Sequence, residues 1–186
     1  SSIGYLGEEV GKGYLSPGAD IARLLRGRED IGSLVEKCLV ARMRLVFTWG
    51  GCQVEGESLV LVYTGNGKGK TTAALGLALR QVGWDRKVLV IQFMKDKGNV
   101  HGERMAAERY LPLLEIEQHG RDEFVDLKNP AQLDVELARK ALRRAEEALT
   151  SGEYGMVVLD EINVAMATGL VDPKEVLDLL DRRHKN

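Results

Sequence analysis

The sequence has few of the residues that hold small secreted domains or metal sites together. It contains two cysteines, Cys38 and Cys52, which are neither spaced as a CxxC pair nor close in sequence to its three histidines. Two cysteines do not make a disulfide framework, so the chain must rely on a hydrophobic core, which 186 residues can supply. We therefore expect free thiols in a reducing compartment, and neither a disulfide scaffold nor a zinc site.

Excess charge of one sign and long apolar runs are lacking as well. The 26 Lys and Arg nearly balance the 28 Asp and Glu, which argues against a protein that works mainly by coating nucleic acid. No apolar run approaches the roughly 20 residues that cross a bilayer, and the N-terminus lacks the basic and apolar segments of a signal peptide. The sequence predicts a cytoplasmic protein without a nucleic-acid or membrane partner.

Proline is scarce, whereas glycine is plentiful, and the pattern along the chain changes near residue 58. Residues 1–57 are expected to form an N-terminal extension of unknown role: a glycine-rich loop, a helix over 21–39 and a short strand over 45–49. From there on, strands alternate with helices. We expect strands at 59–63, 88–91, 113–116 and 156–159, and helices at 70–82, 102–110, 130–149 and from 173 to about 183. This alternation predicts parallel βαβ units, and hence an α/β three-layer sandwich with a mainly parallel sheet.

A glycine-rich turn follows the first of these strands, Thr64-Gly65-Asn66-Gly67-Lys68-Gly69-Lys70-Thr71-Thr72. Its second half matches the P-loop pattern G-x-x-x-x-G-K-[ST], although Thr64 stands where that pattern has its first glycine. Glycines let backbone N–H groups form a nest for phosphates, and the helix N-terminus behind them attracts the same anion. Lys70 would bind phosphate oxygens and Thr71 would bind Mg²⁺, with Lys68 and Thr72 as further phosphate contacts. The alternative is a plain connecting turn, but the strand before it and the helix after it favour a P-loop domain of the RecA-like type.

A second motif is the apolar strand over 156–159, which runs into Asp160 and Glu161. In a parallel sheet its carboxyl end would lie beside the P-loop, where Asp160 and Glu161 would hold Mg²⁺ directly or through water. One of the two acids could instead cap the following turn. Kinases, ATPases, GTPases and transferases share these two motifs, so the residues alone predict a Mg-nucleotide-binding α/β enzyme.

The residues from 62 to 74 resemble the P-loop of the corrinoid adenosyltransferases, a family that also has Thr at the first glycine position. Further segments resemble that family in the same order, over about residues 59–183. They are Val90-Ile91-Gln92-Phe93-Met94-Lys95, Gly102-Glu103-Arg104, Gly120-Arg121 with Phe124, and Val158-Leu159-Asp160-Glu161-Ile162-Asn163 with Gly169-Leu170.

The resemblance implies transfer of the 5′-deoxyadenosyl group of ATP to the Co(I) of a reduced corrinoid, with triphosphate as the leaving group. It implies catalytic roles for Lys70 and Glu161, nucleotide binding by residues 64–72 and Asn163, and Mg²⁺ or Mn²⁺ as cofactor. Phe124 would pack against the corrin face, its alternative being an ordinary loop-anchoring aromatic. A flavodoxin-like or flavin reductant and a homodimer are further implications.

The sequence departs from this family at both ends. The family continues into another strand ending in Thr-Gly-Arg and a glycine-containing tail, so we expect residues 58–186 to be a C-terminally truncated adenosyltransferase domain. Residues 1–57 could cover the active site or be a fused segment. They could also be upstream sequence that precedes a true start of the protein near Met43. A further alternative is that a strand over 45–48 takes the place in the sheet of the family's missing C-terminal strand. Competing functions are a P-loop NTPase or small-molecule kinase, and a chain that binds ATP or corrinoid without turnover.

Overall fold

The computed structural model describes residues 39–43, 46–49, 52–55, 58–63, 68–96, 98, 101–123, 125–126 and 129–184. The helix predicted over 21–39 lies outside these residues except for Leu39, where the prediction is wrong because Leu39 begins a strand. Among the described residues, no helix is long and apolar enough to cross a membrane.

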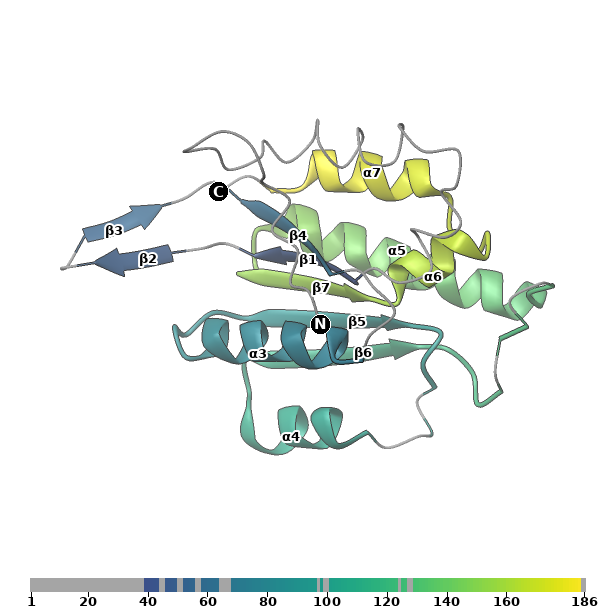
Figure 1. The fold of residues 1–186 in the computed structure, drawn as a ribbon, viewed down its shortest axis with the longest axis horizontal. Coiled ribbons are helices and arrows are strands. Elements are labelled where there is room, and N and C mark those ends of the chain that lie inside the picture. Colours follow the sequence, from purple (N-terminus) through teal and green to yellow (C-terminus); the bar gives the residue numbers. More distant parts are fainter. Residues whose placement is uncertain are drawn as a thin grey trace.

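The centre of the structure is a five-stranded sheet with the order β4-β1-β7-β5-β6 (Figure 1). Its strands are β1 (Leu39–Met43), β4 (Leu59–Tyr63), β5 (Val88–Phe93), β6 (Leu114–His119) and β7 (Met156–Asp160). β5 pairs in parallel with β6 and β7, whereas β1 pairs antiparallel with β4 and β7. β4, β5, β6 and β7 therefore run in one direction and β1 in the other, which confirms the predicted mainly parallel sheet.

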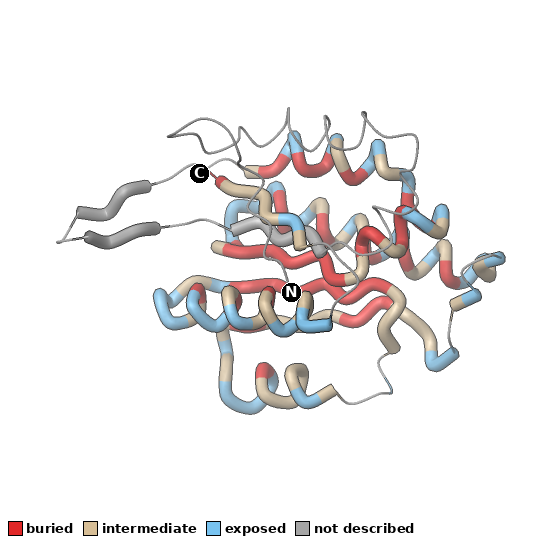
Figure 2. Tube along the Cα trace, viewed as in Figure 1, coloured by how far each residue is buried: buried red, intermediate tan, exposed pale blue. Residues whose placement is uncertain are grey.

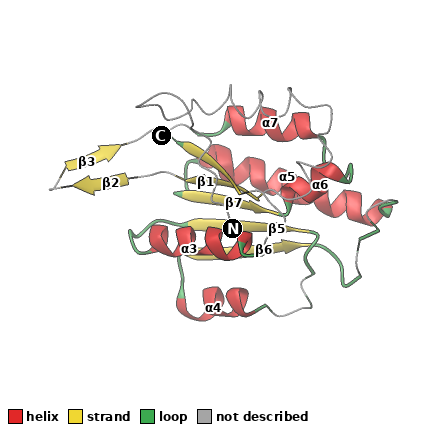
Figure 3. Cartoon of the chain, viewed as in Figure 1, coloured by secondary structure: helices red, strands yellow, loops and turns green. Residues whose placement is uncertain are grey.

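Helices cover both faces of this sheet, as Figure 3 shows. They are α3 (Lys70–Val82), α4 (Gly102–Tyr110), α5 (Gln132–Ser151), α6 (Ile162–Ala167) and α7 (Pro173–Arg182). Side chains of β5 alternate between two cores: Val88 and Val90 pack on the side of α3 and α4, and Leu89, Ile91 and Phe93 pack on the side of α5, α6 and α7. Both faces of β5 and β7 are buried, because each face is covered by helices (Figure 2).

Several predicted elements are confirmed to the residue, among them the strand at 59–63 and the helices at 70–82 and 102–110. Others differ at their ends. β6 begins one residue later than predicted and continues to His119, and α5 begins at Gln132 rather than at 130. The short helix α6 was not predicted, because six residues do not show a helical period.

The strand between β4 and β7 comes from the N-terminal part of the chain. It is β1, Leu39–Met43, and not the segment 45–48 that was considered for a vacant position. The predicted strand near 45–49 is present as β2 (Val46–Trp49), but it pairs with β3 (Cys52–Glu55) in a separate two-stranded sheet.

A buried arginine joins the end of α7 to the beginning of β4. Arg183 is 7% exposed, and its guanidinium donates to the hydroxyl and the carbonyl of Ser58, both at 3.1 Å, and to the carbonyl of Leu180. Burial lowers the pKa of Arg183 from its ordinary value. This contact ties the strand that leads into the phosphate loop to the C-terminal helix.

Candidate functional site

Three polar side chains form a row across the carboxyl ends of neighbouring strands. In the strand register, Gln92 of β5 stands opposite Gln118 of β6 on one side and opposite Asp160 of β7 on the other. Because side chains alternate along a strand, all three share a face with Val90 and Val158, the face that α3 and α4 cover. The row therefore lies where ligands bind in open α/β sheets.

The N-terminus of α3 points to the same place. Gly69 precedes the helix with a φ of +105°, and its carbonyl accepts the first helical hydrogen bond from Ala73 at 2.8 Å. An added Cβ would meet no atom within 4 Å, so glycine is required here for its backbone conformation and not for space. This conformation turns the chain abruptly into the helix that begins with Lys70.

Thr71 brings the two sequence motifs together. Its hydroxyl donates to Oδ1 of Asp160 at 3.0 Å, and Nζ of Lys95 donates to Oδ2 of the same carboxylate at 2.8 Å. Nε2 of Gln92 also donates to Oδ2, at 3.0 Å. Asp160 is only 2% exposed, so these three donors satisfy a carboxylate that would otherwise be costly to bury.

The neighbouring acid is held in an unusual backbone conformation. Glu161 has a φ of +65° and precedes α6. Burial raises the pKa of Glu161, and the charge of Asp160 raises it further, while Lys95 and Lys70 act in the opposite direction. Asn163, two residues on, is 5% exposed in the first turn of α6. The turn thus presents a second carboxyl group beside the Thr71–Asp160 pair.

Other predicted site residues are less constrained. Lys68 and Thr72 are exposed next to the helix N-terminus. Residues 64–67 and Phe124 lie outside the described part of the chain, so their predicted contacts remain predictions.

The loop after β6, which leads to Phe124, is anchored at its base. An added Cβ at Gly120 would lie 2.5 Å from the backbone of Met94, so only glycine fits. Arg121 then forms a two-point ion pair with Asp134 of α5, Nε to Oδ1 at 2.7 Å and Nη2 to Oδ2 at 3.0 Å. The same carboxylate accepts the N–H of Ala131, which caps the start of α5. Residues 120 and 121 are therefore set against β5 and α5.

The donor set fits a magnesium ion that is shared with phosphates. Mg²⁺ prefers oxygen ligands and is usually bound by one or two carboxylates together with substrate phosphates and water. Thr71, Asp160 and Glu161 supply a hydroxyl and two carboxyl groups at one place. Within the described ranges no three or more His, Cys, Asp or Glu side chains gather to hold a metal without such help.

Sequence reasoning did not single out Lys95 and Gln92 as members of the site. A signal for Gln92 exists, because it is the one polar residue in the apolar run of β5, Val88–Phe93. Lys95 follows that strand after two residues and has no comparable signal. Its position beside Asp160 depends on the order of the strands.

Comparison with known proteins supports one family. Residues 56–186 match the family model described as ATP:corrinoid adenosyltransferase BtuR/CobO/CobP. The corrinoid adenosyltransferase of Escherichia coli K12 is 34% identical over 68% of this chain and 63% of its own length. The corrinoid adenosyltransferase of Pseudomonas aeruginosa is 35% identical over 65% of this chain and 59% of its own length. CobA of Salmonella typhimurium is 33% identical over 69% of this chain and 64% of its own length. The chain thus spans about three fifths of the length of these curated relatives.

Proposed function

This chain belongs to the ATP:corrinoid adenosyltransferase family, and from that we propose that it transfers the 5′-deoxyadenosyl group of ATP to the Co(I) of a reduced corrinoid. The observation that carries the proposal is the contact between Thr71 and Asp160, which joins the phosphate loop to the acidic strand end within the family-matched region. A substrate of the cob(I)yrinic acid a,c-diamide or cobalamin type would suit this class.

In the proposed reaction, an electron pair of Co(I) forms the cobalt–C5′ bond while the bond between C5′ and the triphosphate oxygen breaks. Triphosphate leaves with the bonding pair, and no proton has to move. The demands on the protein are therefore to hold the triphosphate, to align C5′ with the cobalt and to keep water away.

We assign the grip on the leaving group to residues 64–72. Lys70 would place a positive charge on the phosphate oxygens at the N-terminus of α3, whose N–H groups attract the same anion. Thr71, Asp160 and Glu161 would hold Mg²⁺, which when bound would stabilise the charge that develops on the triphosphate. Asn163 would contact the nucleotide. Lys95, whose ammonium lies 2.8 Å from Oδ2 of Asp160, would help to hold this carboxylate in place.

We assign Phe124 to the corrin. The support is that Gly120 and Arg121, a few residues before Phe124, are fixed at the carboxyl edge of the sheet. Phe124→Ala should raise the KM for the corrinoid and leave the KM for ATP unchanged, since an aromatic ring supplies apolar contact to the macrocycle and none to phosphate. An equal change in both constants would contradict this role.

The product decides between this proposal and its alternatives. Mixed anaerobically with Mg-ATP and chemically reduced cobalamin, the protein should yield the light-sensitive spectrum of adenosylcobalamin and one equivalent of triphosphate. Release of ADP and orthophosphate would indicate an NTPase, and a phosphorylated acceptor would indicate a kinase. Binding of ATP by calorimetry with no product at all would indicate a binding protein without turnover.

A pair of lysine variants provides the control. Lys70→Ala should abolish measurable turnover and weaken ATP binding, whereas Lys140→Ala, an exposed lysine on α5, should leave both unchanged. We also propose a cytoplasmic location with a flavodoxin-like or flavin reductant for the corrinoid, and a homodimer, which analytical ultracentrifugation would test.

A further inference from the structure

We propose that Gln92 and Gln118 are positioning residues for Asp160, and that Arg104 sets the direction of the hydrogen bonds that link them. We call these four residues the amide relay. The inference rests on the proposed function in one respect, namely that Asp160 takes part in holding the metal of Mg-ATP. It adds residues from β5, β6 and α4 to a site otherwise built from α3 and β7.

The relay is a continuous chain of side-chain hydrogen bonds. Nη1 of Arg104 donates to Oε1 of Gln118 at 3.2 Å, and Nε2 of Gln118 donates to Oε1 of Gln92 at 3.0 Å. Nε2 of Gln92 then donates to Oδ2 of Asp160, also at 3.0 Å. The chain crosses from α4 through three neighbouring strands in the order β6, β5, β7.

The two ends of the relay leave one direction for its hydrogen bonds. A guanidinium can only donate and a carboxylate can only accept, so Gln118 must offer its oxygen to Arg104 and Gln92 must offer its amide nitrogen to Asp160. The bond between the two glutamines then has a single possible polarity. Both amides point their donor ends toward Asp160, and this arrangement prevents either amide from turning over.

The burial of the relay shows that these amides are not incidental. Gln92 is 0% and Gln118 is 2% exposed. They continue two rows of apolar residues, Val88 and Val90 in β5 and Leu114 and Ile116 in β6, which pack under α3 and α4. An apolar residue at either position would need no hydrogen-bond partner, whereas a buried amide is costly unless it is paired, so the amide pair at this end of the sheet points to a role beyond packing.

That reason is the orientation of Asp160. Gln92 and Lys95 both hold Oδ2, which fixes the plane of the carboxylate and leaves Oδ1 facing Thr71. Hydrogen bonds to the far side of a ligating group commonly fix its orientation and raise its affinity for a metal. A freely rotating carboxylate would have to be ordered each time Mg-ATP binds.

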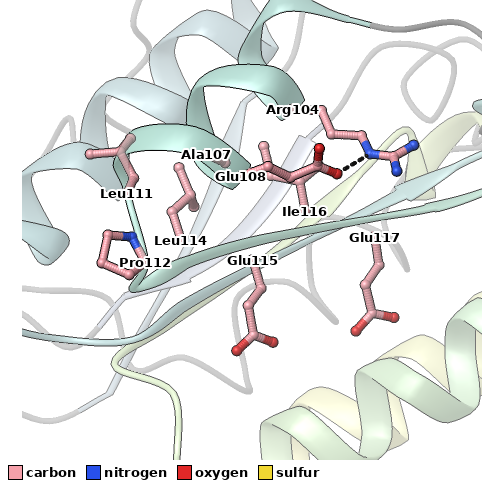
Figure 4. Close-up of a pocket in the computed structure, with 9 residues that line it drawn as sticks. All are labelled: Arg104, Ala107, Glu108, Leu111, Pro112, Leu114, Glu115, Ile116 and Glu117. Atoms are coloured by element: carbon pink, nitrogen blue, oxygen red, sulfur yellow. Dashed lines mark hydrogen bonds and ion pairs between the residues drawn. The ribbon is translucent and has the colours of Figure 1, made fainter.

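The other end of the relay reaches the surface. Arg104 also pairs with Glu108 one turn along α4, Nε to Oε1 at 2.8 Å, and both line a hollow of about 370 Å³ between α4 and β6 (Figure 4). In this view Glu115 and Glu117 point to the opposite side of β6 and do not meet Arg104. The side chain of Arg104 is partly exposed, so replacing it removes the donor to Gln118 without removing a fully buried residue, which makes it a useful test residue.

The test is a titration of ATP binding against Mg²⁺ by calorimetry, using the full chain. Gln92→Met should raise the Mg²⁺ concentration for half-maximal ATP binding about tenfold, because it removes the bond to Asp160 itself. Gln118→Met should raise it about threefold and Arg104→Met less than that, since each leaves the bond from Gln92 to Asp160 in place and removes support farther along the relay. The effect should thus decline with distance along the relay, and ATP affinity at saturating Mg²⁺ should change little.

Two glutamine controls separate this role from a general loss of stability. Gln81→Met replaces a buried glutamine of α3, and Gln132→Met replaces an exposed one at the start of α5. Gln81→Met can lower the Tm as much as Gln92→Met does. Both controls should nevertheless keep the Mg²⁺ concentration for half-maximal ATP binding within about twofold of that of the unchanged protein. If the relay variants lower the Tm and leave the Mg²⁺ requirement unchanged, the glutamines are structural and the inference is overturned.

The same titration distinguishes a failure of the proposed function from a failure of the relay. If the unchanged protein binds ATP in a Mg²⁺-dependent way but forms no adenosylcorrinoid, the proposed reaction is wrong and a graded series would still establish the relay. If adenosylcorrinoid forms and the series shows no gradient, the reaction stands and the relay is wrong. If ATP binding does not depend on Mg²⁺ at all, Asp160 has no metal to hold and the positioning role proposed for the relay is overturned.

Discussion

The hydroxyl of Thr71 donates a 3.0 Å hydrogen bond to Oδ1 of Asp160, although the two residues stand 89 positions apart. Thr71 belongs to the first turn of α3 and Asp160 is the last residue of β7. The contact places the hydroxyl of the phosphate loop and the carboxylate of the acidic strand end at one point. Such a pairing is what a shared magnesium ion and a polyphosphate require.

Replacing Thr71 tests this pairing directly. Thr71→Val keeps the shape of the side chain but loses the hydroxyl, so the Mg²⁺ concentration for half-maximal ATP binding should rise at least about tenfold. Thr71→Ser keeps the hydroxyl and should stay close to the unchanged protein. Both are measured by calorimetric titration at several Mg²⁺ concentrations, and equal behaviour of the two variants would show that the hydroxyl is not a ligand.

Lys95 should stabilise the protein in the absence of nucleotide. Its ammonium lies 2.8 Å from the buried carboxylate of Asp160, and its own side chain is 24% exposed. Lys95→Met should lower the free energy of unfolding by about 1–2 kcal/mol, because a buried charge loses a charged partner. Adding Asp160→Asn should recover part of this loss, since the uncompensated charge is then removed.

Urea denaturation of the four proteins of this cycle provides the measurement. Lys87→Met is the matched control, because Lys87 pairs with Glu153 at an exposed position where an ion pair contributes little. Additive losses in the double variant would contradict a direct coupling between Lys95 and Asp160.

The buried guanidinium of Arg183 should be among the more important contacts for stability. Arg183→Met removes three hydrogen bonds to Ser58 and Leu180 and leaves buried oxygens without these donors. We expect a loss of about 2–3 kcal/mol in the free energy of unfolding, against about 1 kcal/mol for Ser58→Ala, which removes one acceptor only. Chemical denaturation measures both losses. A loss in Arg183→Met no greater than that in Ser58→Ala would contradict the stabilising role of the hydrogen bonds from Arg183 to Ser58 and Leu180.

A pair of carboxyl groups beyond the strand ends should make stability depend on pH. A hydrogen bond to Asp96, together with the negative charge of Asp96, raises the pKa of Asp122 above its ordinary value of 3.8. The folded state therefore keeps this proton to a higher pH than the unfolded state does. It follows that stability declines as the pH rises from 3.8 through the raised pKa of Asp122.

Asp122→Asn should reduce this decline and be more stable than the unchanged protein at neutral pH, because the amide keeps a hydrogen bond to Asp96 without the repulsion. Unfolding midpoints in urea between about pH 3 and pH 7 test the prediction. Asp178→Asn, an exposed position on α7, serves as the control. A parallel pH dependence in the unchanged protein and in Asp122→Asn would exclude the proposed coupling.

The two motifs could be read from the sequence because each is local. The run from Gly69 to Thr71 needs only a strand before it and a helix after it to present its donors, and Met156–Asp160 needs only its apolar pattern to be recognised as a buried strand. Local pattern also predicted α3 and α4 to the residue. Family membership follows from the same segments, since they occur in the family's order.

Strand order, by contrast, cannot be obtained from a local pattern. Nothing in the residues 39–43 indicates that they would lie between β4 and β7 and run against their neighbours. Only Val40 in this short segment favours a strand by residue type, and the choice of its partners is made by hydrogen bonds to residues far along the chain.

The same reason explains how much of the site was predictable. Local pattern was enough to predict a nucleotide-binding site, because Lys70, Thr71 and Asp160 are recognised from neighbours within a few residues. The other side chains that meet the carboxylate of Asp160 are known from the three-dimensional structure alone. Parallel pairing of β5 with β6 and β7 sets Gln92 beside Gln118 and Asp160. Lys95 follows β5 and Arg104 comes from α4, and both reach this row through contacts between residues distant in sequence. The register between strands is a property of the whole sheet, so no local pattern could predict it.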